Sequence, residues 1–128
     1  YNTSNVALPL ELLNAIREGE IISIQGDRAV ANVSQREARL FGENVRLPDG
    51  PFMLAFVAQV PIYPVFIVRT SFHRYKIIAR EPIFCVRTDR DRATAIEEAM
   101  QAWSRTLESV IAAHWSQWFS LVPIFPKR

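Results

Sequence analysis

The sequence predicts an α/β fold: a mixed, mainly parallel sheet flanked by helices, with a long amphipathic helix near the C-terminus. Two observations lead to this prediction. Between residues 8 and 80, short runs rich in Val, Ile and Phe alternate with helical segments, which is typical of parallel sheets. From residue 91 onward, apolar side chains recur about every 3.6 residues, the period of a helix that packs on one side.

The composition is that of one globular domain, which we take as residues 1–128. Hydrophobic residues make up 49% of the chain and charged residues 22%, so a sizeable core can be buried. The formal net charge of +2 is too small by itself to indicate nucleic acid as a partner. The single cysteine, Cys85, cannot form a disulfide within the chain, which fits a cytosol-facing protein.

The first predicted elements are a helix and a strand. Residues 8–18 should form the helix, because Pro9 suits its first turn and Gly19 suits its end. Residues 21–24, with the sequence IISI, should form a buried strand. This strand is expected to end at the motif Gly-Asp-Arg, which contains Asp27 and Arg28.

The middle of the chain predicts a strand, a helix and a second strand. Residues 29–43 show no clean period and are predicted to be a loop. A short strand at 44–47, a helix at 52–58 and a buried strand at 63–69 follow. Because a strand, a helix and a strand in this order usually pair in parallel through a right-handed crossover, we expect a parallel pair.

The last third predicts a returning strand and the long helix. Residues 70–74 should form a tight connection, so the strand at 75–80 returns antiparallel and makes the sheet mixed. The amphipathic helix should run from residue 91 to about residue 115. Thr88 or Asp89 would be a suitable N-cap for it.

A candidate anion site lies in the stretch "LPDGPFMLA", where a sharp turn runs into an apolar helix. If Pro51 is the first helical residue, the N–H groups of Gly50, Phe52 and Met53 point out of the helix start. A helix start carries partial positive charge and commonly receives phosphate or carboxylate. The alternative is that Asp49 caps the helix with its own carboxylate and that nothing else binds there.

Two further charged positions follow predicted strands. Asp27 and Arg28 come just after the first strand, and Arg69 ends the strand at 63–69. Ligands of α/β sheets usually bind beyond the carboxyl ends of strands. Together with the helix start, two arginines at one edge would form an anion clamp. Taken singly, each of these side chains would more often be a solvated surface charge.

No catalytic centre is evident in these residues. General-base catalysis needs a His oriented by an acid, but neither His73 nor His114 has an acidic residue at helical spacing. The chain has no Gly-x-Ser-x-Gly elbow, no P-loop lysine and no His-Cys metal spacing. Cys85 follows apolar residues and should be an inert, packed thiol. We therefore expect no catalytic residue, no metal and no cofactor here.

Five motifs occur in a recognisable order. They are "REGEIISIQGDR", "LFGENVRLPDGPFMLA", "VPIYPVFIVR", "RYKIIAREPI" and "HWSQWFSLVPIF". This order resembles the C-terminal half of the lysophospholipid acyltransferase superfamily, most closely the bacterial lipid A biosynthesis acyltransferase branch. Asp27 matches the acidic position of the first motif, and Gln117 and Trp118 match the Gln-aromatic pair of the last. A His-Arg-Arg cluster often follows that pair in lipid A enzymes, whereas this chain continues with Leu121, Val122 and Pro123.

The resemblance implies transfer of a fatty acyl group from acyl carrier protein or acyl-CoA to a lipid hydroxyl. It places the protein on the cytoplasmic side of the bacterial inner membrane, either peripheral or anchored through N-terminal sequence. The family's His-x4-Asp/Glu dyad is missing, so we expect the C-terminal portion of a larger acyltransferase domain. The residues expected to bind the substrate are Asp27, Arg28, Asp49, Gly50 and Arg69. The alternative is a stand-alone, non-catalytic module that binds an acyl carrier or an anionic lipid.

A cluster of aromatic residues leaves a membrane contact open. The longest apolar run, residues 52–68, is too short for a membrane span and contains Pro61 and Pro64. The aromatic side chains near the C-terminus, with the basic residues at 126–128, could lie on a membrane surface or could close the core. These side chains are Trp103, Trp115, Trp118 and Phe119.

Overall fold

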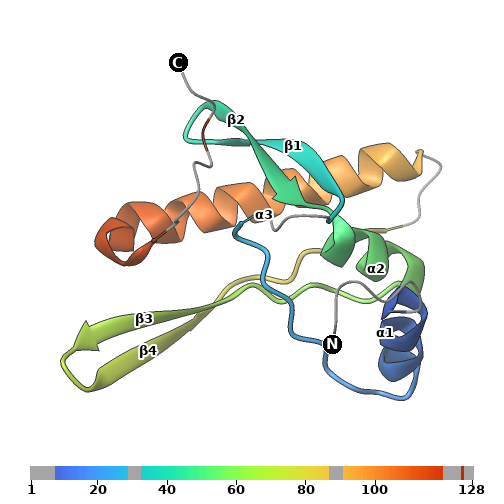
Figure 1. Ribbon diagram of the computed structural model, residues 1–128, viewed down its shortest axis with the longest axis horizontal. Helices are drawn as coiled ribbons and strands as arrows, with labels where there is room; N and C mark the ends of the chain where they lie inside the picture. Colours follow the sequence, from blue (N-terminus) through green and yellow to red (C-terminus); the bar gives the residue numbers. More distant parts are fainter. Residues whose placement is uncertain (1–7, 29–32, 87–90, 120–124, 126–128) are drawn as a thin grey trace.

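The computed structural model describes residues 8–28, 33–86, 91–119 and 125. A long helix, α3, crosses the molecule, with one β-hairpin on one side of it and a second hairpin projecting on the other (Figure 1). The elements are α1 (Leu8–Arg17), β1 (Gln35–Leu40), β2 (Glu43–Pro48), α2 (Gly50–Ala58), β3 (Val65–Ser71), β4 (Arg74–Ala79), α3 (Arg92–His114) and the 3-10 helix η1 (Trp115–Gln117).

Helix α1 confirms the first predicted element. It ends at Arg17, and Gly19 follows with φ of 88°, a left-handed conformation that glycine adopts without strain. The strand predicted at residues 21–24 is wrong, because these residues have no strand partner among the described residues. Ile21 is 95% exposed rather than buried. The apolar run instead lines a groove, as described below.

The loop predicted at residues 29–43 is wrong from Gln35 onward, where β1 begins; residues 29–32 lie outside the described residues. Strand β1 has the sequence QREARL, whose charged residues concealed an alternation that buries Ala38 and Leu40. Phe41 and Gly42 make the turn to β2, both with positive φ, as two-residue hairpin turns often require.

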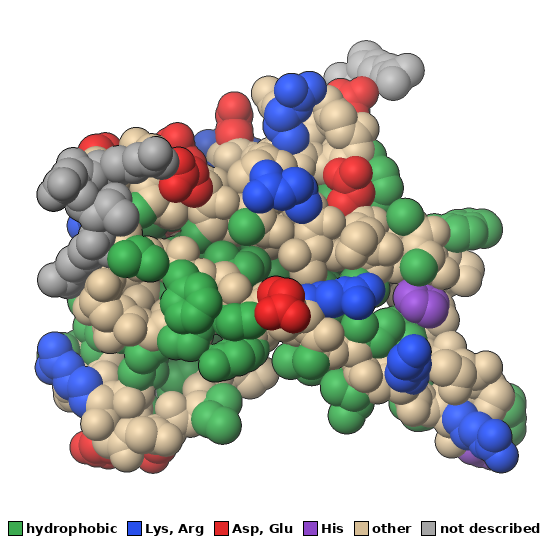
Figure 2. Space-filling view, turned by 180° about the vertical axis from the view of Figure 1, so that it is seen from behind, with side chains coloured by type: hydrophobic (Ala, Val, Ile, Leu, Met, Phe, Trp, Pro, Cys, Tyr) green, Lys and Arg blue, Asp and Glu red, His purple; other side chains and the backbone are tan. Residues whose placement is uncertain are grey.

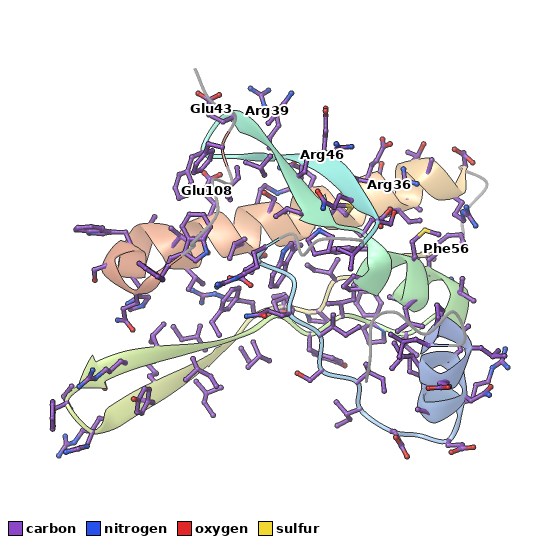
Figure 3. The ribbon with its side chains drawn as sticks, viewed as in Figure 1. Arg36, Arg39, Glu43, Arg46, Phe56 and Glu108 are labelled. Atoms are coloured by element: carbon purple, nitrogen blue, oxygen red, sulfur yellow. The ribbon has the colours of Figure 1, made fainter. Side chains whose placement is uncertain are left out.

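The backbone of β1 is held by side chains of α3. Gln101 accepts from the N–H of Arg39 at 3.0 Å and donates to its carbonyl at 3.1 Å, and Ser104 donates to the same carbonyl at 2.6 Å. The carboxylate of Glu108 accepts from the N–H of Phe41 at 2.7 Å. Figure 3 shows Glu108 on α3 facing the β1–β2 turn. The helix therefore satisfies backbone groups along the outer edge of β1.

The expected mainly parallel sheet is wrong. The described strands form two separate two-stranded sheets, β1–β2 and β3–β4, and both are antiparallel. Each pair is joined by a two-residue turn, so each strand pairs with its neighbour in the chain. Helix α2 connects the hairpins, but β2 and β3 do not pair with each other. The antiparallel return predicted after residue 74 is confirmed by β4.

The core lies between α3 and the elements on either side of it. Helix α3 confirms the predicted amphipathic helix, and Asp91 occupies its N-cap position without a side-chain capping bond. The alternative caps Thr88 and Asp89 lie outside the described residues. No helix in the described part of the chain combines the length and the apolar character that crossing a membrane requires. The largest fully buried side chains include Leu40, Val45, Leu47, Phe52, Ile96 and Met100.

Candidate functional site

Two adjoining grooves hollow one side of the molecule, the first between α1, α2 and the start of β3, and the second between residues 24–28, β3 and the end of α3. The first, called the apolar groove, has a volume of about 550 Å³. It is lined mainly by residues 19–24, the first turns of α2, residues 60–65 and Trp103. The second, called the polar groove, has a volume of about 370 Å³ and is lined by residues 24–28, residues 65–68 and the end of α3 with Gln117 and Trp118. Both volumes are within the range of small-molecule sites.

The two grooves share one wall. Ile24, Gly26, Val65 and Trp103 line both of them. Figure 2 shows hydrophobic side chains gathered over the centre of the face seen from behind. A molecule lying in both grooves would therefore contact an apolar surface in the first groove and, in the second, charged and amide groups beside further apolar side chains.

Trp103 holds this shared wall in place. Its indole N–H donates to the carbonyl of Gly26 at 3.0 Å, and its ring stacks on Phe66 with centroids 5.6 Å apart. A Cβ atom on Gly26 would lie 3.3 Å from Cζ2 of Trp103. The close approach of the two residues therefore favours glycine at position 26.

Asp27 and Arg28 form an ion pair in the polar groove. Nη2 and Nε of Arg28 donate to Oδ2 of Asp27 at 2.6 and 3.1 Å. The hydrogen bond to Asp27, followed by its charge, raises the pKa of Arg28 above the ordinary arginine value. Both side chains keep some exposure, 34% for Arg28 and 19% for Asp27. The pair can therefore offer an acceptor and a donor to a polar ligand group.

Gln117 fixes β3 at the far end of the polar groove. Its side-chain amide accepts from the N–H of Arg69 at 2.7 Å and donates to the carbonyl of Arg69 at 2.9 Å. The neighbouring Trp118 also lines this groove, and its indole nitrogen is buried without a hydrogen-bond partner among the described residues. The Gln-aromatic pair singled out in the sequence thus meets the Gly-Asp-Arg motif in one groove.

The helix start at Gly50 differs from the expected anion cradle. The N–H groups of Phe52 and Met53, predicted to be free, donate to the carbonyl of Asp49 at 3.1 and 3.0 Å. The carboxylate of Asp49 makes no capping bond, so that alternative is also wrong. The Asp49 carboxylate is buried, and its Oδ2 accepts from Nε of Arg36 at 3.1 Å, while Oδ1 has no partner in the part of the chain that the structure describes. This buried carboxylate disfavours a second anion at the helix start.

Arg69 bonds to the tip of its own hairpin. Its guanidinium donates to the carbonyls of Ser71 and Phe72 at 2.9 and 2.8 Å and lies over the Phe72 ring, 5.3 Å from the centroid. Of the predicted binding residues, Asp27 and Arg28 line the polar groove, while Asp49, Gly50 and Arg69 line neither groove. The structure therefore does not assemble all five into one clamp, and their role in substrate binding stays a prediction.

The histidines and the cysteine occupy different surroundings. His73 lies in the β3–β4 turn, edge-on to Phe72, whereas His114 ends α3 and lines the polar groove, a position the sequence analysis missed. Burial raises the pKa of the Cys85 thiol to about 11, which fits the packed thiol that was predicted. Among the described residues, no three His, Cys, Asp or Glu side chains gather in a way that could hold a metal ion.

The adjoining apolar and polar grooves suit an amphiphilic ligand, the kind of molecule that lipid-modifying acyltransferases handle. Comparison with protein families gives a match over residues 9–127 to the family described as bacterial lipid A biosynthesis acyltransferase. The chain therefore belongs to the bacterial lipid A biosynthesis acyltransferase family, which confirms the resemblance found in the motif order. Comparison with curated individual proteins gives no significant match.

Proposed function

We propose that this chain forms the substrate-binding side of an acyltransferase. The enzyme would move a fatty acyl group from an acyl thioester, on acyl carrier protein or coenzyme A, to a lipid hydroxyl at the cytoplasmic side of the bacterial inner membrane. The observation that carries this proposal is the shared wall of the two grooves, because it joins an apolar groove to one that also holds charged and amide groups. The family match supports acyl transfer as the reaction class.

The apolar groove would hold the acyl chain. Side chains of Ile22, Leu54 and Ile62 line it, and Trp103 closes its boundary with the polar groove. Burial of methylene groups against such a surface stabilises binding by about 0.8 kcal/mol for each CH₂. Chain length would then be selected by how far the groove extends.

The polar groove would hold the head of the acceptor or the phosphate of the donor. Arg28 can donate to a phosphate or sugar oxygen, and Asp27 can accept from a hydroxyl. A phosphate would compete with Asp27 for Arg28, since the two side chains are paired at 2.6 Å. Asp49 and Gly50 would act at the start of α2, and Arg69 would have to leave the carbonyls of the hairpin turn to reach a substrate.

The reaction needs a base that these residues do not supply. The acceptor oxygen forms an ester bond to the acyl carbon, the carbon–sulfur bond breaks, the hydroxyl proton passes to the base and the thiolate is protonated as it leaves. Neither His73 nor His114 is followed five residues later by Asp or Glu. We therefore assign proton transfer to residues outside these 128, with this chain as the binding partner.

Binding of dodecanoyl-CoA tests the proposal on the chain itself. Titration calorimetry below the micelle concentration should show that dodecanoyl-CoA binds at least about tenfold more tightly than CoA, because only the thioester carries an apolar chain. Ile22→Glu should abolish that preference by placing a charge in the apolar groove. Val57→Glu, a matched change on an exposed face of α2 outside the groove, should leave it intact.

Three results would overturn this function. Equal affinity for CoA and dodecanoyl-CoA would exclude the acyl-chain site. Transfer of the dodecanoyl group to a lipid hydroxyl by the 128 residues alone would exclude an external base. Dodecanoyl-CoA binding that survives Ile22→Glu would place the acyl chain elsewhere and leave a non-catalytic carrier-binding module as the better description.

A further inference from the structure

We propose that the β3–β4 hairpin, residues 65–79, docks on an anionic lipid bilayer through its outer face. This inference deepens the proposed function, because it names the surface by which the substrate-binding side would meet its lipid. The outer face is defined here as Val65, Ile67, Tyr75 and Ile77 on the strands, with Phe72 at the tip.

The outer face is apolar and solvent-exposed. In the antiparallel register Ile67 lies opposite Ile77 and Val65 opposite Ala79, so these side chains lie on the same side of the hairpin. Val65, Ile67, Tyr75 and Ile77 are 54%, 70%, 65% and 69% exposed, and Phe72 is 76% exposed. On the opposite side, Val68 is buried and Phe66 stacks on Trp103. A contiguous exposed apolar surface of this kind marks an interaction site.

The charges around this face have one sign. By the strand register Arg69 shares the side of the outer face, whereas Arg74, Lys76 and Arg80 alternate to the other side of the narrow hairpin and flank this face. No Asp or Glu occurs between Asp49 and Glu81. The hairpin projects from the body of the molecule, and its tip points away from α3 (Figure 1). In the space-filling view, the projecting part at lower right shows basic and hydrophobic side chains and no acidic one (Figure 2). Such a surface is complementary to anionic headgroups over an acyl interior.

The tip is held ready for this contact. Arg69 donates to the carbonyls of Ser71 and Phe72, and the hydroxyl of Thr70 donates to the carbonyl of Arg74 at 3.3 Å. These bonds close the turn while the Phe72 side chain stays exposed. A tip that is already ordered loses little conformational entropy when it inserts.

The outer face also continues into the grooves. Val65 lines both grooves and Ile67 lines the polar groove, so the wall of the site is the base of the hairpin. A lipid that leaves the bilayer along the hairpin would arrive beside Asp27 and Arg28.

A second copy of the chain fits this surface less well than a bilayer. Face-to-face pairing of two hairpins would bring Arg69 of each copy, with the flanking cations of both hairpins, close together without an acid on either hairpin, and like charges oppose association. An acidic protein would pair with the cations of the hairpin but would not cover the exposed apolar side chains of its outer face. An anionic bilayer satisfies both features at once.

Vesicle flotation of the full chain tests the proposal. The chain should float with phosphatidylcholine vesicles that contain phosphatidylglycerol, and not with phosphatidylcholine alone, and high salt should weaken the binding. Arg74→Glu/Lys76→Glu should lower the partition coefficient by about 30-fold or more, since each lost cation contributes roughly fivefold. Arg92→Glu/Arg105→Glu, the same charge change on exposed positions of α3, is the matched control and should float like the wild type.

A second pair of variants tests the apolar part. Phe72→Ser should lower the partition coefficient, whereas Phe84→Ser, at a residue 60% exposed elsewhere, should not. Urea unfolding of each variant should give the wild-type midpoint, because neither side chain belongs to the core. Light scattering at the same concentration tests for self-association, and the wild-type chain and the Phe72→Ser variant should have the same mass.

Three results would overturn the proposal. They are no flotation of the wild-type chain with anionic vesicles, equal loss in the hairpin and α3 charge variants, and self-association that Phe72→Ser abolishes. The last would assign the face to a second copy. Vesicle binding does not depend on acyl transfer, so its failure leaves the proposed reaction untouched, and failed dodecanoyl-CoA binding leaves the docking surface untouched.

Discussion

The side-chain amide of Gln117 binds both backbone groups of Arg69, accepting from the N–H at 2.7 Å and donating to the carbonyl at 2.9 Å. Gln101 makes the same two-point contact with the backbone of Arg39. One glutamine thus ties each hairpin to the C-terminal helical segment, which extends from α3 into η1. Each amide substitutes for the neighbouring strand that β1 or β3 would otherwise need at this position.

Loss of the Gln117 contact should loosen β3. We expect Gln117→Ala to lower the free energy of unfolding by about 1 kcal/mol, the net value of exposed hydrogen bonds, and to speed hydrogen exchange at the Arg69 amide. Gln117→Glu should retain protection of that amide but lose the bond to the carbonyl. Gln25→Ala, at an exposed position of the same groove, serves as the control. Unchanged exchange at Arg69 in Gln117→Ala would contradict the contact.

The buried pair at the start of α2 should be important for stability. Arg36→Leu leaves the carboxylate of Asp49, which is 4% exposed, without its partner, so we expect a loss of about 2–3 kcal/mol in the free energy of unfolding. Arg46→Leu, on the exposed face of β2, should change it by less than about 0.5 kcal/mol. Figure 3 shows both arginines on the same hairpin. Chemical denaturation of the two variants measures these free energies of unfolding. Equal losses in the two variants would show that the Arg36–Asp49 pair contributes nothing to stability.

Trp103 should stabilise the groove wall through two separable contacts. Trp103→Phe keeps a ring beside Phe66 but removes the bond to the Gly26 carbonyl, so we expect a cost of about 1–2 kcal/mol. Trp103→Ala removes both and should cost about 3–5 kcal/mol. Trp115→Phe, at a residue 76% exposed, should be neutral. If Trp103→Phe proves as harmful as Trp103→Ala, the hydrogen bond rather than the packing holds the wall.

Cys85 should react slowly while the chain is folded. With its pKa raised to about 11 by burial, compared with an ordinary value of 9.0, its thiolate fraction at pH 8 falls about a hundredfold. A disulfide reagent should therefore modify it far faster in urea than in buffer. The protonated thiol is favoured in the folded state, so this contribution to stability is complete below pH 9 and is lost as the pH rises toward 11. Cys85→Ala should remove that part of the pH dependence.

The sequence predicted the elements whose signals are local. The apolar period of α3, the stop at Gly19 and the turn before α2 each lie within one or two helical turns of chain, and all three elements are present. The sequence left open whether the aromatic side chains near the C-terminus close the core or lie on a membrane surface. Trp103 is buried and Trp118 packs against the core, so the first alternative holds for these two. Trp115 and Phe119 are exposed. The basic residues at 126–128 lie outside the described residues.

The sequence could not predict which distant groups would become partners. Strand β1 was missed because its burial pattern is hidden among charged residues. The side chains that bind its backbone and that of the following turn, Gln101 and Glu108, lie 62 and 67 positions away from their partners Arg39 and Phe41. The parallel pair was expected from element order alone, whereas the two-residue turns at Phe41 and Phe72 favoured local antiparallel pairing. Nothing in the motif "LPDG" indicates that Asp49 would be buried against Arg36.

The sequence by itself determined two properties of this protein. The order of its motifs determined the family, and its composition determined the basic stretch without Asp or Glu between Asp49 and Glu81, because both are properties of the linear chain. Only the tertiary structure decided that Asp27 and Arg28 share a groove with Gln117, while Arg69 bonds to its own turn. The physical reason is that hydrogen bonds and ion pairs act over a few ångströms of space. Packing of α3 against both hairpins, and not the spacing of residues along the chain, therefore selects their partners.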